Sequence, residues 1–244
     1  MGVGEDFEPF AQACGVEIEA PDLIGHGIFQ CDDPTQYSLD AQLTYWENRI
    51  AKGSILIGYS MGGRLALQFA CRYPERLAGL VLIGATPGIR HPLERTKRQQ
   101  WDRRQAEHIR DMGVEQFYQQ WQQLPIIATQ QRIDLAIQMK MKVNRLTQSI
   151  EGLVNSMTHF GTGTMSDCWE ALPSLNMPIL LMVGEEDAKY RGIANQMIDR
   201  LPEGTVDCVV ISGAGHCVHL EQISESADVF KQWLQRQVNG CSLM

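Results

Sequence analysis

Ser60 is the residue whose surroundings most favour a chemical role. It lies in the pentapeptide Gly58-Tyr59-Ser60-Met61-Gly62, between the apolar run of residues 54–58 and a segment of helical periodicity over residues 62–73. A serine on a sharp turn between a buried strand and a helix has the context of a nucleophile elbow. Glycine at both ends fits this turn, because side chains there are expected to collide with neighbouring backbone. The Met61 amide and the helix N-terminus can stabilise negative charge beside the serine, as an oxyanion hole does.

Two further residues follow strand-like segments and could activate this serine. Asp187 comes after the apolar run of residues 178–184, and His216 follows the run of residues 206–211. Folds with a nucleophile elbow present serine, acid and histidine in this chain order, and open α/β sheets build their sites at the carboxyl ends of their strands. Histidine accepts the serine proton and the carboxylate orients the imidazole. The sequence therefore predicts Ser60, Asp187 and His216 as catalytic residues.

Neighbouring residues offer alternatives at two of these positions. Glu185 and Glu186 could supply the carboxylate, but Asp187 lies furthest into the loop beyond the strand and is preferred. His219 is a rival for His216. The glycine-rich lead-in Gly213-Ala214-Gly215 favours His216, and His219 is interpreted as a surface or helix-entry residue.

Strand-like and helical segments alternate around these residues. Strand, helix and strand in succession imply a parallel sheet with right-handed crossovers, and therefore an α/β fold. A glycine-rich loop after residues 16–20 contains His26, which is interpreted as structural. The predicted strands are residues 16–20, 54–58, 77–83, 178–184 and 206–211, and the predicted core helices are residues 38–51, 62–73 and 221–238.

Residues 87–170 differ in character from the rest of the chain. Strand-like runs disappear, glutamine, arginine and methionine dominate, and the periodicity is helical. A segment of about 80 residues is too long for a loop, so it predicts an all-helical insertion. The predicted organisation is a core of residues 1–86 and 171–244 with a helical cap of residues 87–170.

Composition excludes several classes of partner. A net charge of −8 gives no bulk attraction for nucleic acid or anionic lipid. Seven scattered cysteines, without CxxC or Cys/His metal spacing, indicate reduced thiols in a cytoplasmic protein and no metal site. No signal peptide, membrane span or organic cofactor is expected. Residues 241–244 formally fit a prenylation box, but Ser242 stands where an aliphatic residue is usual, so lipidation is not expected.

Arginines supply a local exception to the negative charge. Six arginines and one lysine lie within residues 90–110. Forked guanidinium groups bind multiply charged anions well, so a small carboxylate substrate is a plausible ligand. Arg64 is the most suggestive, because it lies one helical turn into the elbow helix. Taken alone, Arg98 and Arg145 are interpreted as solvated residues of the cap. Arg103 and Arg104 are also interpreted as solvated residues.

A set of motifs spread along the chain resembles one known family. The motifs are Gly58-Tyr59-Ser60-Met61-Gly62-Gly63-Arg64, Pro87-Gly88-Ile89, Trp121 with Pro125, Asn144-Arg145, Gly161-Thr162-Gly163, Gly184-Glu185-Glu186-Asp187-Ala188-Lys189 and Gly213-Ala214-Gly215-His216-Cys217-Val218-His219. Together they resemble the MenH family of 2-succinyl-6-hydroxy-2,4-cyclohexadiene-1-carboxylate synthases, within the α/β-hydrolase superfamily. The combination of Arg64, the arginine-bearing cap and Trp121 is its most specific part.

This resemblance implies an α/β-hydrolase fold, with a mostly parallel sheet flanked by helices and an all-helical cap. It also implies a lyase, because the family removes pyruvate from a cyclohexene carrying several carboxylates, in menaquinone and, in phototrophs, phylloquinone biosynthesis. In that reaction the histidine-activated serine is taken to abstract a ring proton while arginines hold the carboxylates. The resemblance assigns substrate-binding roles to Tyr59, Arg64, Arg98, Trp121 and Arg145.

The resemblance further implies segments that precede residues 16–20 in a complete fold of this kind. These are the first strands and a His-Gly loop that supplies one amide of the oxyanion hole. Residues 1–7 are similar to the stretch immediately after that loop. We therefore expect a functional gene product that begins upstream of Met1, with the Met61 amide as the half of the oxyanion hole that this sequence carries.

Two other functions remain open at the level of sequence. The same fold could hydrolyse an ester or a carbon–carbon bond, although a neutral substrate has no need of converging Arg64, Arg98 and Arg145. The chain could also be an inactive binding module. The intact serine, acid and histidine argue against that reading, and the short N-terminus argues for it.

Overall fold

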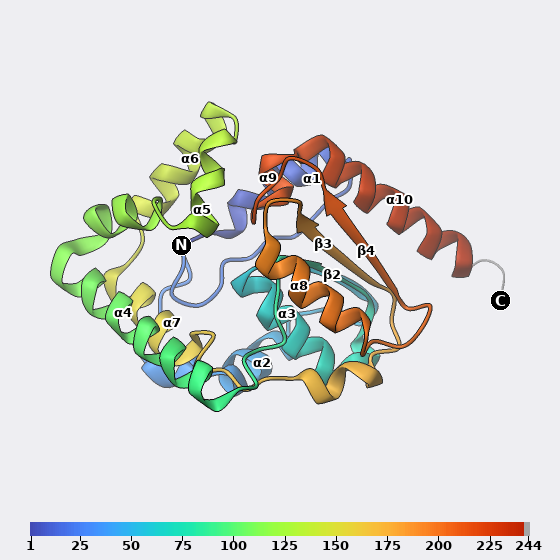
Figure 1. Ribbon diagram of the computed structural model, residues 1–244, viewed down its shortest axis with the longest axis horizontal. Helices are drawn as coiled ribbons and strands as arrows, with labels where there is room; N and C mark the ends of the chain where they lie inside the picture. The colour runs from blue at the N-terminus through green and yellow to red at the C-terminus, as the bar shows by residue number, and fades with distance from the viewer. Residues whose placement is uncertain (242–244) are drawn as a thin grey trace.

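A four-stranded parallel sheet forms the centre of the molecule in the computed structural model, which describes residues 1–241 (Figure 1). Its strands are β1 (Ser54–Tyr59), β2 (Leu77–Ile83), β3 (Ile179–Gly184) and β4 (Val206–Ile211), and they lie side by side in that order. All three pairings are parallel, which confirms the α/β fold class. Apart from the backbone of Cys241, the prenylation box lies outside the described residues.

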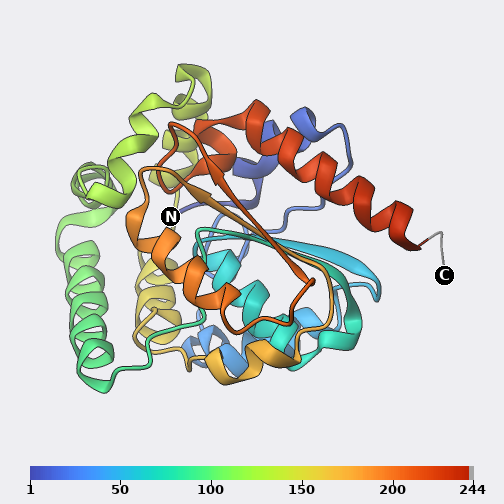
Figure 2. The same cartoon turned by 45° about the vertical axis from the view of Figure 1, so that its right-hand side comes forward.

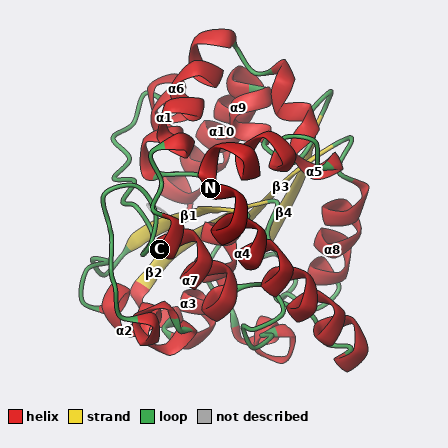
Figure 3. Ribbon diagram, turned by 90° about the vertical axis from the view of Figure 1, so that its left-hand side faces the viewer, coloured by secondary structure: helices red, strands yellow, loops and turns green. Residues whose placement is uncertain are grey.

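Helices cover both faces of this sheet (Figures 1 and 3). The two central strands send alternate side chains to the two layers, as the period of a strand requires. Leu80 and Leu82 join the core on the α3 side, whereas Val81 and Ile83 join the core on the α10 side. One layer contains α1 (Glu8–Cys14) and α10 (Ile223–Cys241), and the other contains α2 (Leu39–Glu47), α3 (Met61–Arg72) and α8 (Ala188–Ile198).

Between β2 and β3 the described chain contains helices and no strand, and we keep the name cap for residues 87–170. The cap helices lie to one side of the sheet (Figure 2). The first and last of them, α4 and α7, pack together through the buried side chains of Ala106, Ile109, Phe117, Leu153 and Val154. The helices are α4 (Pro92–Trp121), α5 (Pro125–Ala128), α6 (Leu135–Leu146) and α7 (Ile150–Phe160).

Short helical segments connect these elements. The 3-10 turn η4 (Thr129–Arg132) lies in the cap, and α9 (Val218–Glu221) follows the histidine loop. Within residues 1–241, no helix combines the length and apolarity needed to cross a membrane. The remaining 3-10 turns are η1 (Gly4–Phe7), η2 (Pro34–Tyr37), η3 (Pro74–Arg76) and η5 (Trp169–Ser174).

The strand predicted over residues 16–20 is wrong. Alternation alone does not make a strand, because the backbone must also pair with a neighbour. Within the described chain β1 pairs with β2 alone, and residues 16–20 lie with β1 on the wall of one large cavity. β1 is thus an edge strand of the described sheet, and most of its residues are partly exposed. It is not the doubly covered strand that its apolar run suggested.

Candidate active site

Ser60 has the backbone of a strained turn. It follows β1 directly, precedes α3, and has φ of 50° and ψ of −104°, the single positive φ of a non-glycine residue in the described chain. Such a conformation costs about 1–3 kcal/mol and persists where the surrounding structure enforces it. Here the Ser60 N–H donates to the Ile83 carbonyl at 2.9 Å, which fixes the turn to the end of β2.

The glycines around Ser60 differ in what they tolerate. A Cβ on Gly58 would lie 2.6 Å from both the Gly62 carbonyl oxygen and the Gly63 Cα, so the expected collision holds at this position. At Gly62 the expectation is wrong, because a Cβ there would meet nothing within 4 Å and would face the cavity. Gly63 carries the second constraint, since its Cβ would lie 2.7 Å from that of Ala85.

Ser60, His216 and Asp187 form a continuous hydrogen-bonded chain. The Asp187 carboxylate lies 2.6 Å from His216 Nδ1, and His216 Nε2 lies 3.0 Å from Ser60 Oγ. A carboxylate only accepts, so it fixes the proton on Nδ1 and leaves Nε2 to accept from the serine hydroxyl. The Asp187 carboxylate also accepts the Tyr190 N–H at 3.2 Å, which caps α8 and holds the acid in place. This arrangement can remove a proton from Ser60.

The alternative acids make other contacts. The Glu185 carboxylate accepts from the Ser212 hydroxyl at 3.0 Å and the Gly213 N–H at 2.9 Å. The Glu186 carboxylate forms an exposed ion pair with Arg132. Neither contacts the imidazole, so the geometry favours Asp187 as the carboxylate partner of His216.

Of the two places that the sequence suggested for His219, the helix entry is confirmed and the surface is wrong. It is the second residue of α9, is 1% exposed, and stacks on the ring of Phe7 with centroids 4.7 Å apart. His26 is also buried, with Nδ1 3.2 Å from the Ile24 carbonyl oxygen. Burial lowers the pKa of each imidazole to about 3, because the charged form would lose its hydration.

These two histidines make stability sensitive to acid. Below about pH 6.5 they take up protons in the unfolded chain but stay neutral in the native one, until pH approaches their native pKa of about 3. Each can lower the free energy of unfolding by up to about 1.4 kcal/mol per pH unit. We expect the free energy of unfolding measured in urea to be lower at pH 5 than at pH 7. Its slope against pH should be shallower for His219→Gln than for the exposed control His108→Gln. Equal slopes would contradict this assignment.

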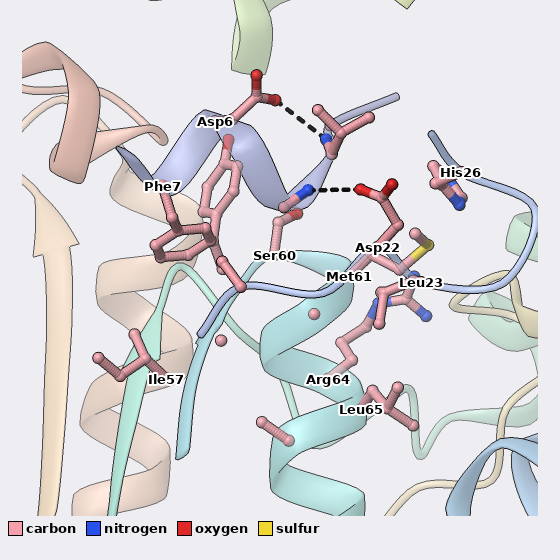
Figure 4. Close-up of a pocket in the computed structure, with 18 of the residues that line it drawn as sticks. Asp6, Phe7, Asp22, Leu23, His26, Ile57, Ser60, Met61, Arg64 and Leu65 are labelled. Carbon is pink, nitrogen blue, oxygen red and sulfur yellow. Dashed lines mark hydrogen bonds between the residues drawn. The ribbon is translucent and has the colours of Figure 1, made fainter. Parts of the chain in front are cut away.

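A cavity of about 1860 Å³ opens beside Ser60, Met61 and Arg64 (Figure 4). Its wall brings together all the predicted binding residues. Ligand pockets commonly measure about 300–1,000 Å³, so this one exceeds the needs of a small substrate. Part of it runs along the open edge of β1. The predicted residues on its wall are Tyr59, Ser60, Met61, Arg64, Arg98, Trp121, Arg145 and His216.

Two guanidinium groups in this cavity are buried without a carboxylate partner. Arg64 is 7% exposed and donates to the Phe160 carbonyl at 3.0 Å. Arg145 is 9% exposed and donates to the Gln130 side-chain oxygen at 3.1 Å. Among residues 1–241 no carboxylate lies within ion-pair distance of either. Burial lowers the pKa of Arg64 to about 10, so it remains a cation at neutral pH.

Arg98 differs from these two, because its charge is already offset. Its Nε donates to the Asp102 carboxylate at 2.8 Å, and its guanidinium lies 4.8 Å from the centroid of Trp101. Arg103 and Arg104, one turn further along α4, are exposed. Arg98 therefore offers N–H donors to the cavity, but most of its positive charge is already offset by Asp102.

Aromatic side chains complete the wall. Trp121 lies at the end of α4 against Phe117, with ring centroids 5.5 Å apart. Tyr59 lies over His216 at 5.2 Å between centroids, and burial keeps its hydroxyl protonated by raising its pKa well above 10. Met61 is the first residue of α3, a position whose N–H has no partner within the helix. That amide is free to donate towards charge developing near Ser60.

Sequence reasoning missed other residues of this wall. Lys189 lies two residues after Asp187 in the first turn of α8, and its position in that motif was the available signal. Burial, followed by the charge of Arg98, lowers the Lys189 pKa. Gln130 carried no signal, because an isolated glutamine in a glutamine-rich cap resembles its neighbours. Within the described chain, no group of three or more His, Cys, Asp or Glu side chains is arranged to hold a metal ion.

The profile of the alpha/beta hydrolase family matches residues 3–230. With the sheet, the elbow and the order of serine, acid and histidine, this match shows that the chain belongs to the alpha/beta hydrolase family.

Relatives narrow the likeness to MenH. A Bacillus subtilis (strain 168) protein, provisionally named 2-succinyl-6-hydroxy-2,4-cyclohexadiene-1-carboxylate synthase, is 37% identical over 82% of this chain and 74% of its own length. The enzyme with that name from Salmonella newport (strain SL254) is 31% identical over 74% of this chain and 68% of its own. The structure of MenH from S. aureus superposes with a TM-score of 0.90 at 27% identity, covering 96% of this chain and 90% of that one. The chain is thus a MenH-like alpha/beta hydrolase.

Other folds of this kind are similar in shape alone. A thermophilic esterase from Thermogutta terrifontis superposes with a TM-score of 0.80 at 24% identity, over 96% of this chain and 86% of that one. Because esterases and MenH share this framework, the fold does not choose between ester hydrolysis and elimination. The residues of the cavity must make that distinction.

Proposed function

We propose that this protein is a 2-succinyl-6-hydroxy-2,4-cyclohexadiene-1-carboxylate synthase, a lyase that eliminates pyruvate from a cyclohexene polycarboxylate during menaquinone or phylloquinone biosynthesis. The observation that supports it is the pair of buried guanidinium groups, Arg64 and Arg145, which share a cavity with Ser60 and have no carboxylate partner among residues 1–241. Buried charges are costly unless they are paired. A substrate bearing several carboxylates supplies the missing partners.

In this proposal Ser60 acts as a base. His216 Nε2 takes the hydroxyl proton, and Ser60 Oγ removes a proton from a ring carbon of the substrate. A ring double bond forms as the carbon–oxygen bond to the departing group breaks, and the electron pair leaves on the enolate of pyruvate. The proton held by His216 converts this enolate to pyruvate and restores the neutral imidazole. Negative charge that develops on the substrate during proton removal faces the Met61 amide and the N-terminus of α3. No acyl-enzyme is formed.

Release of pyruvate is the experiment that tests the assignment. Purified protein is incubated with the cyclohexene polycarboxylate and pyruvate is measured with lactate dehydrogenase, alongside hydrolysis of a neutral p-nitrophenyl ester. We expect pyruvate release to depend on enzyme concentration and to exceed ester turnover. Ester hydrolysis without pyruvate release would assign the chain to the hydrolases instead.

Removing the cavity arginines should weaken substrate binding. We expect Arg145→Ala to raise KM by about 10- to 100-fold, because a hydrogen bond to a charged group contributes about 1.5–3 kcal/mol. Arg98→Ala should raise KM less, since Asp102 already offsets part of its charge. Arg103→Ala, on an exposed position of the same helix, is the matched control. Unchanged KM in both the Arg98 and the Arg145 variants would contradict the proposal that these arginines bind the carboxylates of the substrate.

A further inference from the structure

The 3-10 turn η4 contacts every loop that carries a catalytic group. It belongs to the cap, between α5 and α6, and packs against α9. Its side chains reach three separate segments of the core: the elbow through Tyr59, the acid loop through Glu186, and α9, directly after the histidine loop, through Glu221. Three residues of this one turn, Thr129, Gln130 and Arg132, thus connect segments that lie far apart in sequence.

Glu221 is the strongest of these connections. Its carboxylate accepts the backbone N–H of Gly215 at 2.7 Å and that of Cys217 at 3.0 Å, the residues on either side of His216. The same carboxylate accepts the Thr129 hydroxyl of η4 at 2.9 Å. One side chain therefore fixes the backbone on both sides of the catalytic imidazole and joins it to the cap.

The packing at this point leaves little freedom. A Cβ on Gly215 would lie 2.2 Å from Thr129 Oγ1, so the histidine loop rests directly against η4. Hydrogen bonds to an ionised acceptor are roughly twice as strong as neutral ones. The position of His216 relative to Ser60 is consequently tied to the position of η4.

Gln130 extends the connection to the substrate side of the cavity. The side chain is 8% exposed, and its amide bridges two groups. Arginine can only donate, so the amide oxygen faces Arg145 at 3.1 Å and the nitrogen faces the Tyr59 hydroxyl at 3.5 Å. An anion held by Arg145 is therefore two contacts away from the residue that precedes Ser60.

We infer that η4 is the element through which the cap aligns the catalytic chain, with Glu221 and Gln130 as positioning residues for His216 and Tyr59. This inference rests on the proposed function for the identity of the substrate, but the geometry it describes holds for any reaction of Ser60. The exposed Arg132–Glu186 pair adds a third connection, which contributes little because water screens it.

Glu221→Gln tests the inference with nearly the same shape. An amide keeps one accepting oxygen and turns an NH2 group toward a backbone N–H, so at least one flank of His216 loses its acceptor. We expect kcat for pyruvate release to fall by about 10- to 100-fold, with KM within about twofold because no substrate-binding group is touched. Glu225→Gln, one turn further on at an exposed position, is the control and should leave both constants unchanged.

A probe that does not depend on the natural substrate separates the two proposals. Fluorophosphonates form a phosphorus–oxygen bond with an activated serine and expel fluoride, while histidine takes the serine proton. We expect Glu221→Gln to slow modification of Ser60 by a similar factor, with circular dichroism and melting temperature showing that the protein is folded. Wild-type rates of modification in a folded Glu221→Gln protein would overturn the inference. Slow modification together with absent pyruvate release in the wild type would instead leave the positioning role intact and refute the proposed substrate.

Gln130 provides the second measurement. Gln130→Met keeps the length of the side chain but removes both polar contacts. We expect it to raise KM through Arg145 and to lower kcat through Tyr59, whereas Gln131→Met, at an exposed neighbouring position, should do neither. A change in KM alone would show that Gln130 serves only Arg145, and would overturn the coupling to the elbow.

Discussion

Ser60→Ala is expected to abolish pyruvate release while leaving the protein folded and able to bind substrate. The hydroxyl is the group that His216 activates, and alanine offers no atom that can take up the ring proton. Removing one member of such a hydrogen-bonded unit commonly costs about 10³- to 10⁶-fold in kcat. Arg64 and Arg145 are untouched, so the variant should keep both groups proposed to bind the carboxylates of the substrate. Calorimetric titration of the variant measures the binding that remains.

His216→Ala should give a loss of the same order, and the double variant should lose little more. The two residues act as one unit, so their effects are not additive. A Ser60→Ala protein that retains a tenth of wild-type activity would show that the base is another group. His216→Ala with full activity would remove the hydrogen-bonded chain from the mechanism altogether.

The parts of the site that could be predicted from sequence are those encoded by local signals. Gly58, Ser60 and the flanking apolar runs specify the elbow within about twenty residues. Asp187 and His216 follow directly from the two strands that precede them, because parallel strands bring their carboxyl ends to one edge. The strand boundaries agree with the prediction to within one residue for β1 and β3 and fully for β2 and β4.

What could not be predicted depends on contacts between distant segments. Residues 16–20 have a strand-like pattern, but a strand also needs a paired neighbour, and sequence alternation does not reveal one. The sequence predicts His219 to be a surface or helix-entry residue, because polar residues usually lie at the surface, whereas Phe7 and Tyr59 enclose it at the start of α9. The contacts of Gln130 and Glu221 join the cap to loops up to 92 residues away, and no local pattern encodes them.

The arginines illustrate the same limit at the level of charge. Resemblance to a family predicted which arginines face the cavity, but not which of them are neutralised. Arg98 carries its own carboxylate partner, Asp102, four residues further along the same helix. Arg64 comes from α3 and Arg145 from the cap helix α6, and among residues 1–241 neither has a carboxylate within ion-pair distance. We therefore predict that Arg98 contributes less to anion binding than Arg64 and Arg145, although nothing in the sequence distinguishes the three in this respect.

Gly58→Ala and Gly62→Ala are expected to affect stability in opposite directions, although the two glycines are symmetric about Ser60. A Cβ at position 58 would press on the Gly62 and Gly63 backbone at 2.6 Å, and backbone inside a packed helix cannot move aside cheaply. Overpacking of this kind costs about 1–3 kcal/mol, and about 1 kcal/mol shifts Tm by roughly 2–4 °C in a chain of this size. We therefore expect Gly58→Ala to lower Tm by about 2–12 °C.

Gly62→Ala should leave Tm unchanged or raise it by a few degrees, because alanine is favoured over glycine in a helix by up to about 1 kcal/mol and the new methyl group meets nothing within 4 Å. Differential scanning calorimetry of the two variants measures both effects. Equal destabilisation by the two substitutions would mean that the elbow requires glycine for its backbone conformation at both ends. Opposite effects would show that, of the two glycines symmetric about Ser60, only Gly58 is required for steric reasons, and that Gly62 instead keeps the floor of the cavity open beside Ser60. In that case Gly62→Ala would also raise KM, since its methyl group would occupy space next to the reacting hydroxyl.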